Sequence, residues 1–150
     1  MATITKEIKE LSKITSEEWK EWTMTVWNIA NISDSVHPAV FPVEIPYRLL
    51  RMFSFWGETI LDPFSGTGTT GEAALSNGRK YVGFETNSTY YERSTQRLLE
   101  VIQNKNIENA NEAFVIHNHS CLDMASIPDN SIGAVITSPP YWNKADYGCL

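Results

Sequence analysis

The sequence predicts an α/β protein in which helices flank a mostly parallel, doubly wound sheet. Short apolar runs alternate with amphipathic stretches along most of the chain, which is the pattern of repeated strand–helix units. A glycine-containing loop follows the first apolar run, and a proline-containing loop follows the last. Ligands of such sheets bind at the carboxyl ends of the strands, so these two loops form the candidate functional site.

The first 45 residues are expected to lie outside the sheet. Residues 1–14 are charged and poorly periodic, and we expect a short helix or a mobile arm there, followed by one domain at 15–150. Thr15 to Glu18 has the capping-box pattern that begins a helix. Trp19, Trp22 and Val26 then fall on one helical face, which we interpret as packing rather than as a binding platform. Residues 28–45 have the composition of a loop.

The remaining elements are expected to alternate. Pro46 suits the first turn of a helix that Gly57 would end, and Gly78 is the expected stop of the helix after the glycine loop. The segment between the last two strands is expected to contain only turns. The predicted strands cover 59–61, 81–84, 113–116 and 131–137, and the two helices between the first three strands cover 69–77 and 88–104.

Composition limits the function classes. The chain has 150 residues, enough for one domain with a core, a formal net charge of −6, and a pI near 5.0. Proteins that bind nucleic acid unaided usually carry a basic stripe, so either this sequence does not bind nucleic acid or the basic surface lies outside this sequence. Cys121 and Cys149 lack metal-ligand spacing, and His117 with His119 is only a pair, so no metal is expected. Without a signal or membrane segment, the expected location is cytoplasmic.

The first loop has the chemistry of a nucleotide cradle. Glycine lets the backbone approach a ligand, and the N-terminus of the following helix offers free N–H groups. Glu85 ends the next strand, where nucleotide-binding folds place an acid for ribose hydroxyls. No Lys follows the glycines, which excludes a P-loop. We interpret Gly66 and Gly68 as the first two glycines of a dinucleotide-binding fingerprint that lacks its third glycine. The loop comprises Asp62, Pro63, Phe64, Ser65, Gly66, Thr67, Gly68, Thr69 and Thr70.

The second loop suits a flat substrate that bears an amine. It consists of Ser138, Pro139, Pro140 and Tyr141. Two prolines directly after a strand cannot extend the sheet and make the loop stiff. Ser138 offers an oxygen to an amine, and Tyr141 offers a ring on which a flipped base can stack. The alternative is a proline-rich turn with a tyrosine in the core.

A third segment, His37 to Pro46, allows two interpretations. It is either a rigid loop that leads into a helix or a flap over the ligand, with Phe41 as its apolar contact.

These motifs together resemble those of the S-adenosylmethionine-dependent amino-methyltransferases of bacterial restriction–modification systems, and more narrowly those that form N4-methylcytosine. The resemblance covers roughly residues 15–147. It implies that the cofactor S-adenosyl-L-methionine binds the loop at 62–70, Glu85, and the flap residues Phe41 and Pro42. It also implies that Ser138 to Tyr141 is the catalytic motif, in which a leading Ser favours cytosine N4. The family's acid near the cofactor adenine is absent, and Ser120 or Asp123 stands closest to it.

The resemblance further implies an incomplete Rossmann-like class I methyltransferase sheet with about four parallel strands. The family adds about three more strands and a separate basic domain that recognises DNA. We therefore expect DNA as a partner through a separate recognition domain, and a complementing polypeptide or self-association at the open sheet edge. Two alternatives remain open: an adenine-N6 or RNA base methyltransferase, and a non-enzymatic remnant or S-adenosylmethionine-binding module.

Overall fold

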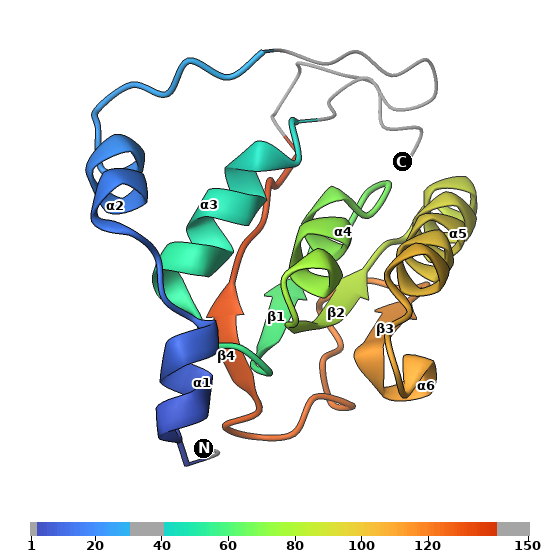
Figure 1. The fold of residues 1–150 in the computed structure, drawn as a ribbon. Coiled ribbons are helices and arrows are strands. Elements are labelled where there is room, and N and C mark those ends of the chain that lie inside the picture. Colours follow the sequence, from blue (N-terminus) through green and yellow to red (C-terminus); the bar gives the residue numbers. More distant parts are fainter. Residues whose placement is uncertain (1–2, 31–40, 141–150) are drawn as a thin grey trace.

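The computed structural model describes residues 3–30 and 41–140 (Figure 1). Within these residues the chain forms six helices and four strands. The helices are α1 (Lys6–Leu11), α2 (Ser16–Trp22), α3 (Glu44–Phe53), α4 (Thr69–Ser76), α5 (Ser88–Lys105) and α6 (Ala110–Ala113), and the strands are β1 (Thr59–Asp62), β2 (Lys80–Phe84), β3 (Phe114–His117) and β4 (Ile132–Val135). None of these helices is long and apolar enough to cross a membrane.

The four strands are parallel and lie in the order β3-β2-β1-β4, which confirms the predicted α/β class. From β1 the chain passes through α4 to β2 and through α5 to β3, always moving toward the same edge. It then returns to the other side of β1 to form β4 (Figure 1). The direction of winding therefore reverses between β1 and β4, and such a reversal opens a crevice at the carboxyl ends of the strands.

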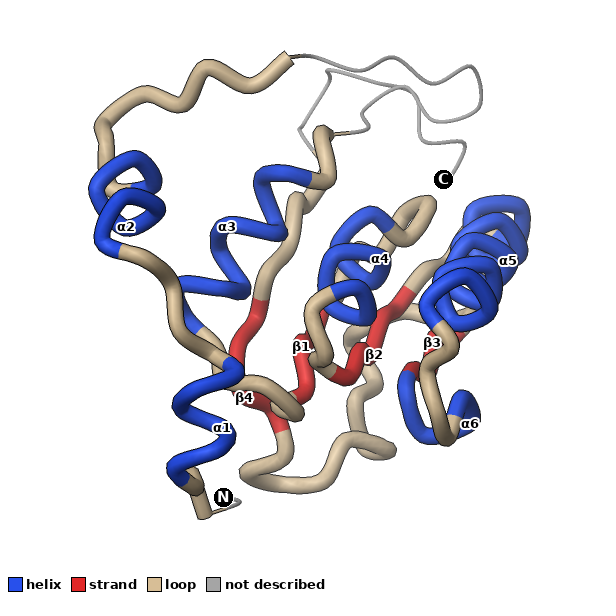
Figure 2. Tube along the Cα trace, in the orientation of Figure 1, coloured by secondary structure: helices blue, strands red, loops and turns tan. Residues whose placement is uncertain are grey.

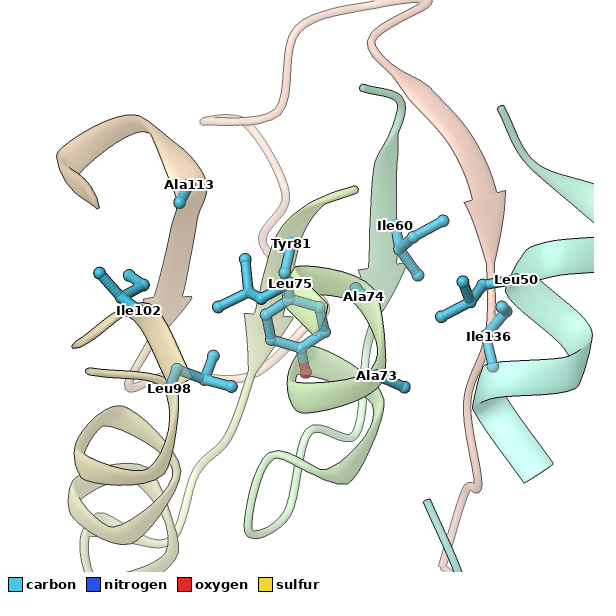
Figure 3. Close-up of a cluster of buried hydrophobic side chains, with 10 residues drawn as sticks. All are labelled: Leu50, Ile60, Ala73, Ala74, Leu75, Tyr81, Leu98, Ile102, Ala113 and Ile136. Atoms are coloured by element: carbon cyan, nitrogen blue, oxygen red, sulfur yellow. The ribbon is translucent and has the colours of Figure 1, made fainter. Parts of the chain in front are cut away.

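The core fills one face of this sheet, where α3, α4 and α5 pack (Figures 2 and 3). Ile60 of β1 and Tyr81 of β2 are 0% and 1% exposed beneath these helices. Leu50, Leu75 and Leu98 contribute from α3, α4 and α5 respectively. The helices thereby fix the strand ends that carry the two candidate loops.

The other face of the sheet carries an apolar row. Strand alternation turns Leu61, Val82, Val115 and Val135 away from the side chains of the core. The register pairs Val115 with Val82, Val82 with Leu61 and Leu61 with Val135, so the row crosses all four strands. Val115 and Val135, at its two ends, are 47% and 58% exposed. This row is called the valine row below.

The N-terminal helices differ from the prediction. The prediction that Trp19, Trp22 and Val26 share one helical face was wrong, because α2 ends at Trp22 and Val26 lies beyond it, 70% exposed. Trp19 is 50% exposed, and only Trp22 is buried, edge-on to Tyr47. The Trp27 indole N–H donates to the Trp22 carbonyl at 2.9 Å, which turns the chain away from the helix axis. The capping box at Thr15 and Glu18 is confirmed.

Helix α3 also differs from its predicted bounds. It begins at Glu44, two residues before Pro46, and it ends well before Gly57. Ser54 ends it with extended backbone, and its hydroxyl donates to the Leu50 carbonyl. The other elements match within a few residues, apart from the short α6, which was not predicted and delays the start of β3 by one residue.

Candidate functional site

A cavity of about 270 Å³ opens at the carboxyl ends of β1, β2 and β4. Its volume is close to the lower end of the range of small-molecule sites, roughly 300–1,000 Å³. The two candidate loops meet there, together with the predicted acid and one residue of the predicted flap. The lining comprises Phe41, Pro63, Phe64, Ser65, Gly66, Thr67, Thr69, Phe84, Glu85, Thr86, Tyr90, His119, Ser120, Cys121, Ser138 and Pro140.

The glycine loop depends on left-handed backbone. Gly66 and Gly68 have φ values of 52° and 83°, a region that side chains rarely adopt. The Ser65 N–H donates to the Phe84 carbonyl at 2.9 Å, and the Gly68 N–H donates to the Ser65 carbonyl at 2.9 Å. The loop is therefore folded back over the end of β2 before α4 begins.

The interpretation of the glycine pair as an incomplete fingerprint was wrong. Gly71 stands three residues after Gly68 and completes the G-x-G-x-x-G spacing. A Cβ at Gly71 would lie 2.9 Å from side-chain carbons of Leu98 and Tyr81. The third glycine thus permits close packing of α4 on α5 and β2, which is its role in nucleotide-binding folds.

Glu85 lies at the cavity wall with both carboxylate oxygens partly occupied. Oε2 accepts the Gly66 N–H at 2.9 Å, and Oε1 accepts the Asn87 N–H at 2.8 Å. A carboxylate has about four acceptor positions, so each oxygen can also accept a hydroxyl of a ligand. Glu85 can therefore support the glycine loop and bind a diol at once.

Asp62 lies behind the glycine loop and does not line the cavity. Its side chain is 1% exposed, and Oδ1 accepts the Phe64 N–H at 3.1 Å and the Thr137 hydroxyl at 2.7 Å. Burial raises the pKa of the Asp62 carboxyl, and these hydrogen bonds act in the opposite direction. Four other predicted residues are also absent from the lining: Pro42, Gly68, Thr70 and Pro139.

Two side chains, the buried Tyr81 and the partly exposed Arg97, hold the glycine loop from outside the cavity. The Tyr81 hydroxyl donates to Ser65 Oγ at 2.8 Å. From α5, Arg97 Nη1 donates to the Thr67 carbonyl at 3.3 Å and to Thr69 Oγ1 at 3.2 Å. The positions of the loop atoms that face the cavity are thus determined by side chains outside it.

The proline loop contributes Ser138 and Pro140 to the opposite wall. Tyr141, the expected stacking residue, lies outside the described residues, as does His37 of the expected flap. The structure therefore brings the predicted serine oxygen to the same cavity as the glycine loop and Glu85.

Sequence reasoning missed five lining residues: Phe84, Thr86, Tyr90, His119 and Cys121. Four of them are direct neighbours of Glu85 or Ser120, so adjacency to predicted residues was the available signal. Within residues 3–30 and 41–140, no group of three or more His, Cys, Asp or Glu side chains is placed to hold a metal ion.

Aromatic contacts organise the end of the cavity near β3. The His117 ring stacks on Phe84 with centroids 4.8 Å apart, and His119 meets the same ring edge-on at 5.4 Å. Burial and the neighbouring His119 lower the pKa of His117, and Asp123 opposes them. The arrangement gives this end of the cavity flat, weakly polar walls.

A comparison with protein-family models identifies the chain: residues 2–96 match the N6/N4 methyltransferase model, described as DNA methylase. The chain belongs to the N6/N4 DNA methylase family. It is similar to the type II methyltransferase M.MjaI of Methanocaldococcus jannaschii, with 43% identity over 52% of this chain and 27% of that protein. It is also similar to M.BglI of Bacillus subtilis, with 34% identity over 75% of this chain and 32% of that protein.

Solved structures of this family carry the same fold. A protein of Thermus thermophilus, assigned as a DNA modification methylase and solved with S-adenosyl-L-methionine, superimposes with a TM-score of 0.57 at 31% identity. The superposition covers 77% of this chain and 42% of that structure. The chain thus spans about a third of the length of these curated methylases and less than half of this structural neighbour.

Proposed function

We propose that the cavity binds S-adenosyl-L-methionine and that the chain is part of an enzyme that methylates an exocyclic amine of DNA, at cytosine N4. One observation carries the proposal: the glycine loop, Glu85 and Ser138 line a single cavity at the switch point of the sheet. Family membership and the bound cofactor of the Thermus relative support it. We assign residues 15–150 to a partial catalytic domain that acts in the cytoplasm.

The residues present fit a nucleoside cofactor. The free acceptor positions of Glu85 suit ribose hydroxyls, and Phe84 with His119 offers flat walls to a heteroaromatic ring. Ser120 would provide the polar contact for the ring edge, and Phe41 and Phe64, which line the cavity, would cover the cofactor, with Pro42 just outside the lining. When bound, the cofactor supplies an electrophilic methyl group on a sulfonium.

Ser138 and the Pro139 carbonyl would hold the target amine. Its lone pair is delocalised into the ring, so acceptors that bind its N–H groups favour a pyramidal nitrogen and direct the lone pair toward the methyl group. Alignment of the two reactants then contributes most of the rate. We assign base stacking to Tyr141. The name of the N6/N4 family covers two amine targets, adenine N6 and cytosine N4. The family resemblance implies that Ser at position 138, rather than Asp, favours cytosine.

We propose that a complementing polypeptide, or a second copy, pairs with the open edge of the sheet, and that a separate domain carries the basic surface that recognises DNA. The net charge of −6 leaves little attraction for phosphates. β4 stands at the edge of the described sheet, and the valine row beside it has two half-exposed ends. An open edge next to an apolar face is a surface on which another chain pairs and packs.

Cofactor binding can be tested on the chain alone. Calorimetric titration with S-adenosylhomocysteine should show binding, and Glu85→Gln should weaken it by about 10- to 100-fold, because hydrogen bonds to charged groups contribute about 1.5–3 kcal/mol. Glu108→Gln, an exposed acid on the α5–α6 connection, is the matched control. A wild-type chain that does not bind the ligand would refute the cofactor assignment.

The reaction is tested by co-expression with the adjacent reading frame and mapping of modified bases. N4-methylcytosine should appear and should be lost with Ser138→Ala but kept with Ser131→Ala, a hydroxyl at the other end of β4. N6-methyladenine at defined sites would move the assignment to adenine, and modified RNA alone would move it to RNA. Absence of any new modification, in the presence of cofactor binding, would favour the non-enzymatic alternative.

A further inference from the structure

One side-chain hydrogen bond joins the two loops that wall the cavity. Thr137 Oγ1 donates to Asp62 Oδ1 at 2.7 Å, across 75 positions of sequence. Thr137 directly precedes Ser138, and Asp62 directly precedes Pro63, and both of these neighbours line the cavity. The bond therefore lies at the base of the crevice, where the proposed cofactor wall and the proposed substrate wall begin.

The backbone hydrogen bonds between β1 and β4 reach the level just before this one. The ladder between β1 and β4 continues to the Ile136 N–H, which donates to the Leu61 carbonyl at 3.0 Å. Past that point Pro63 and Pro139 have no N–H to donate. The Thr137 hydroxyl thus extends the connection between the strands by one further bond.

Both partners are well placed to hold a fixed distance. Asp62 is 1% exposed, and its Oδ1 also accepts the Phe64 N–H, so the acceptor is anchored within its own loop. Threonine is restricted at χ1 because it is branched at Cβ. At 2.7 Å the bond has the ordinary length of a hydroxyl hydrogen bond. Thr137 itself is exposed, so the firmness of the pair comes from the buried, anchored Asp62 and from the restricted χ1 of Thr137.

We propose that Thr137 is a positioning residue that holds the Ser138 loop at its working distance from the glycine loop. The inference rests on the proposed function, because it assigns the two walls to substrate and cofactor. Thr137 itself lies outside the cavity lining, so it acts through Ser138. A displacement of about 1 Å between reacting groups can lower a rate by about 100-fold, so loss of this bond should affect transfer more than cofactor binding.

The test compares Thr137→Val, which removes the hydroxyl at nearly constant shape, with Thr137→Ser, which retains it. Ser131→Ala, directly before β4, is the control for loss of a hydroxyl at the other end of the strand. Affinity for S-adenosylhomocysteine is measured on the chain by calorimetry, and kcat for methyl transfer is measured on the co-expressed assembly. Thr137→Val should lower kcat at least 10-fold and change the affinity less than about 3-fold. Thr137→Ser should recover most of the kcat.

Three outcomes would overturn the inference. If Thr137→Val retains wild-type kcat, the bond does not position the loop, and the proposed function stands. If the variant loses affinity and kcat together and Thr137→Ser does not recover them, the hydroxyl only supports the fold. If the wild-type chain neither binds S-adenosylhomocysteine nor transfers methyl groups, the proposed function itself has failed, and the positioning role falls with it.

Discussion

Gly71→Ala tests a close packing contact at the centre of the fold. A Cβ there would lie 2.9 Å from Leu98 Cδ1 and from two ring carbons of Tyr81, whereas ordinary contacts begin near 3.4 Å. Leu98 and Tyr81 are 0% and 1% exposed, so neither can move toward solvent to make room. Overpacking of this kind costs about 1–3 kcal/mol.

The same substitution has a favourable part that must be subtracted. Alanine stabilises a helix interior by about 0.8–1 kcal/mol relative to glycine. The net expectation is a destabilisation of up to about 2 kcal/mol. For a chain of this size, each kcal/mol lowers Tm by roughly 2–4 °C. Thermal unfolding followed by circular dichroism measures the shift.

A double-mutant cycle with Leu98→Ala identifies the cause. Leu98→Ala opens space beside position 71, so Gly71→Ala should cost less in that background, with a coupling energy of about 1 kcal/mol. A cycle without coupling would show that α4 can move away from β2 at little cost. The third glycine would then have no packing role.

Two further predictions concern groups beside the cavity. Tyr81→Phe leaves Ser65 Oγ, on a residue 5% exposed, without its hydrogen-bond donor. The substitution should lower the free energy of unfolding, measured in urea, by about 1–2 kcal/mol and weaken S-adenosylhomocysteine binding several-fold. An unchanged urea midpoint and affinity would show that the hydroxyl is dispensable. The pKa of His117 is lower in the folded chain than in the unfolded chain, so the unfolded chain binds the proton more readily. The free energy of unfolding should therefore fall as the pH drops through about 6.5. His117→Phe keeps a ring against Phe84 and should flatten this dependence between pH 7 and 5; equal slopes would refute it.

The strands and their positions along the chain were predictable because local sequence signals agree with the tertiary fold. The apolar runs at 59–61 and 81–84 lie in the middle of the described sheet, so burial and pattern give the same answer. The N-terminal helices were not predictable to the same degree. Trp19 and Trp22 have equal hydrophobicity in the sequence, and only contact with Tyr47 and Arg48, more than 20 positions away, decides which one is buried.

The site was predictable as a set of motifs but not as a set of contacts. A motif shows that Asp62 belongs to the glycine loop, yet it does not show on which side of the loop the carboxylate lies. Its direction depends on Thr137, 75 residues away, and on the burial of β1 between β2 and β4. His119 and Cys121 line the cavity beside Ser120, and their adjacency to that predicted residue was the signal in the sequence.

The two carboxylates beside the glycine loop divide its support between them. Asp62 binds the Phe64 N–H from behind the loop, and Glu85 binds the Gly66 N–H from the cavity side. These N–H groups belong to a turn with left-handed glycine backbone, which gains stability only when its amides find acceptors. Only Glu85 keeps acceptor positions that face a ligand, so cofactor affinity should depend on Glu85, whereas Asp62 links the loop to Thr137 and hence to the opposite wall. The same local requirement, to satisfy the amides of one tight turn, thus accounts for both the proposed binding site and its connection to the proposed substrate loop.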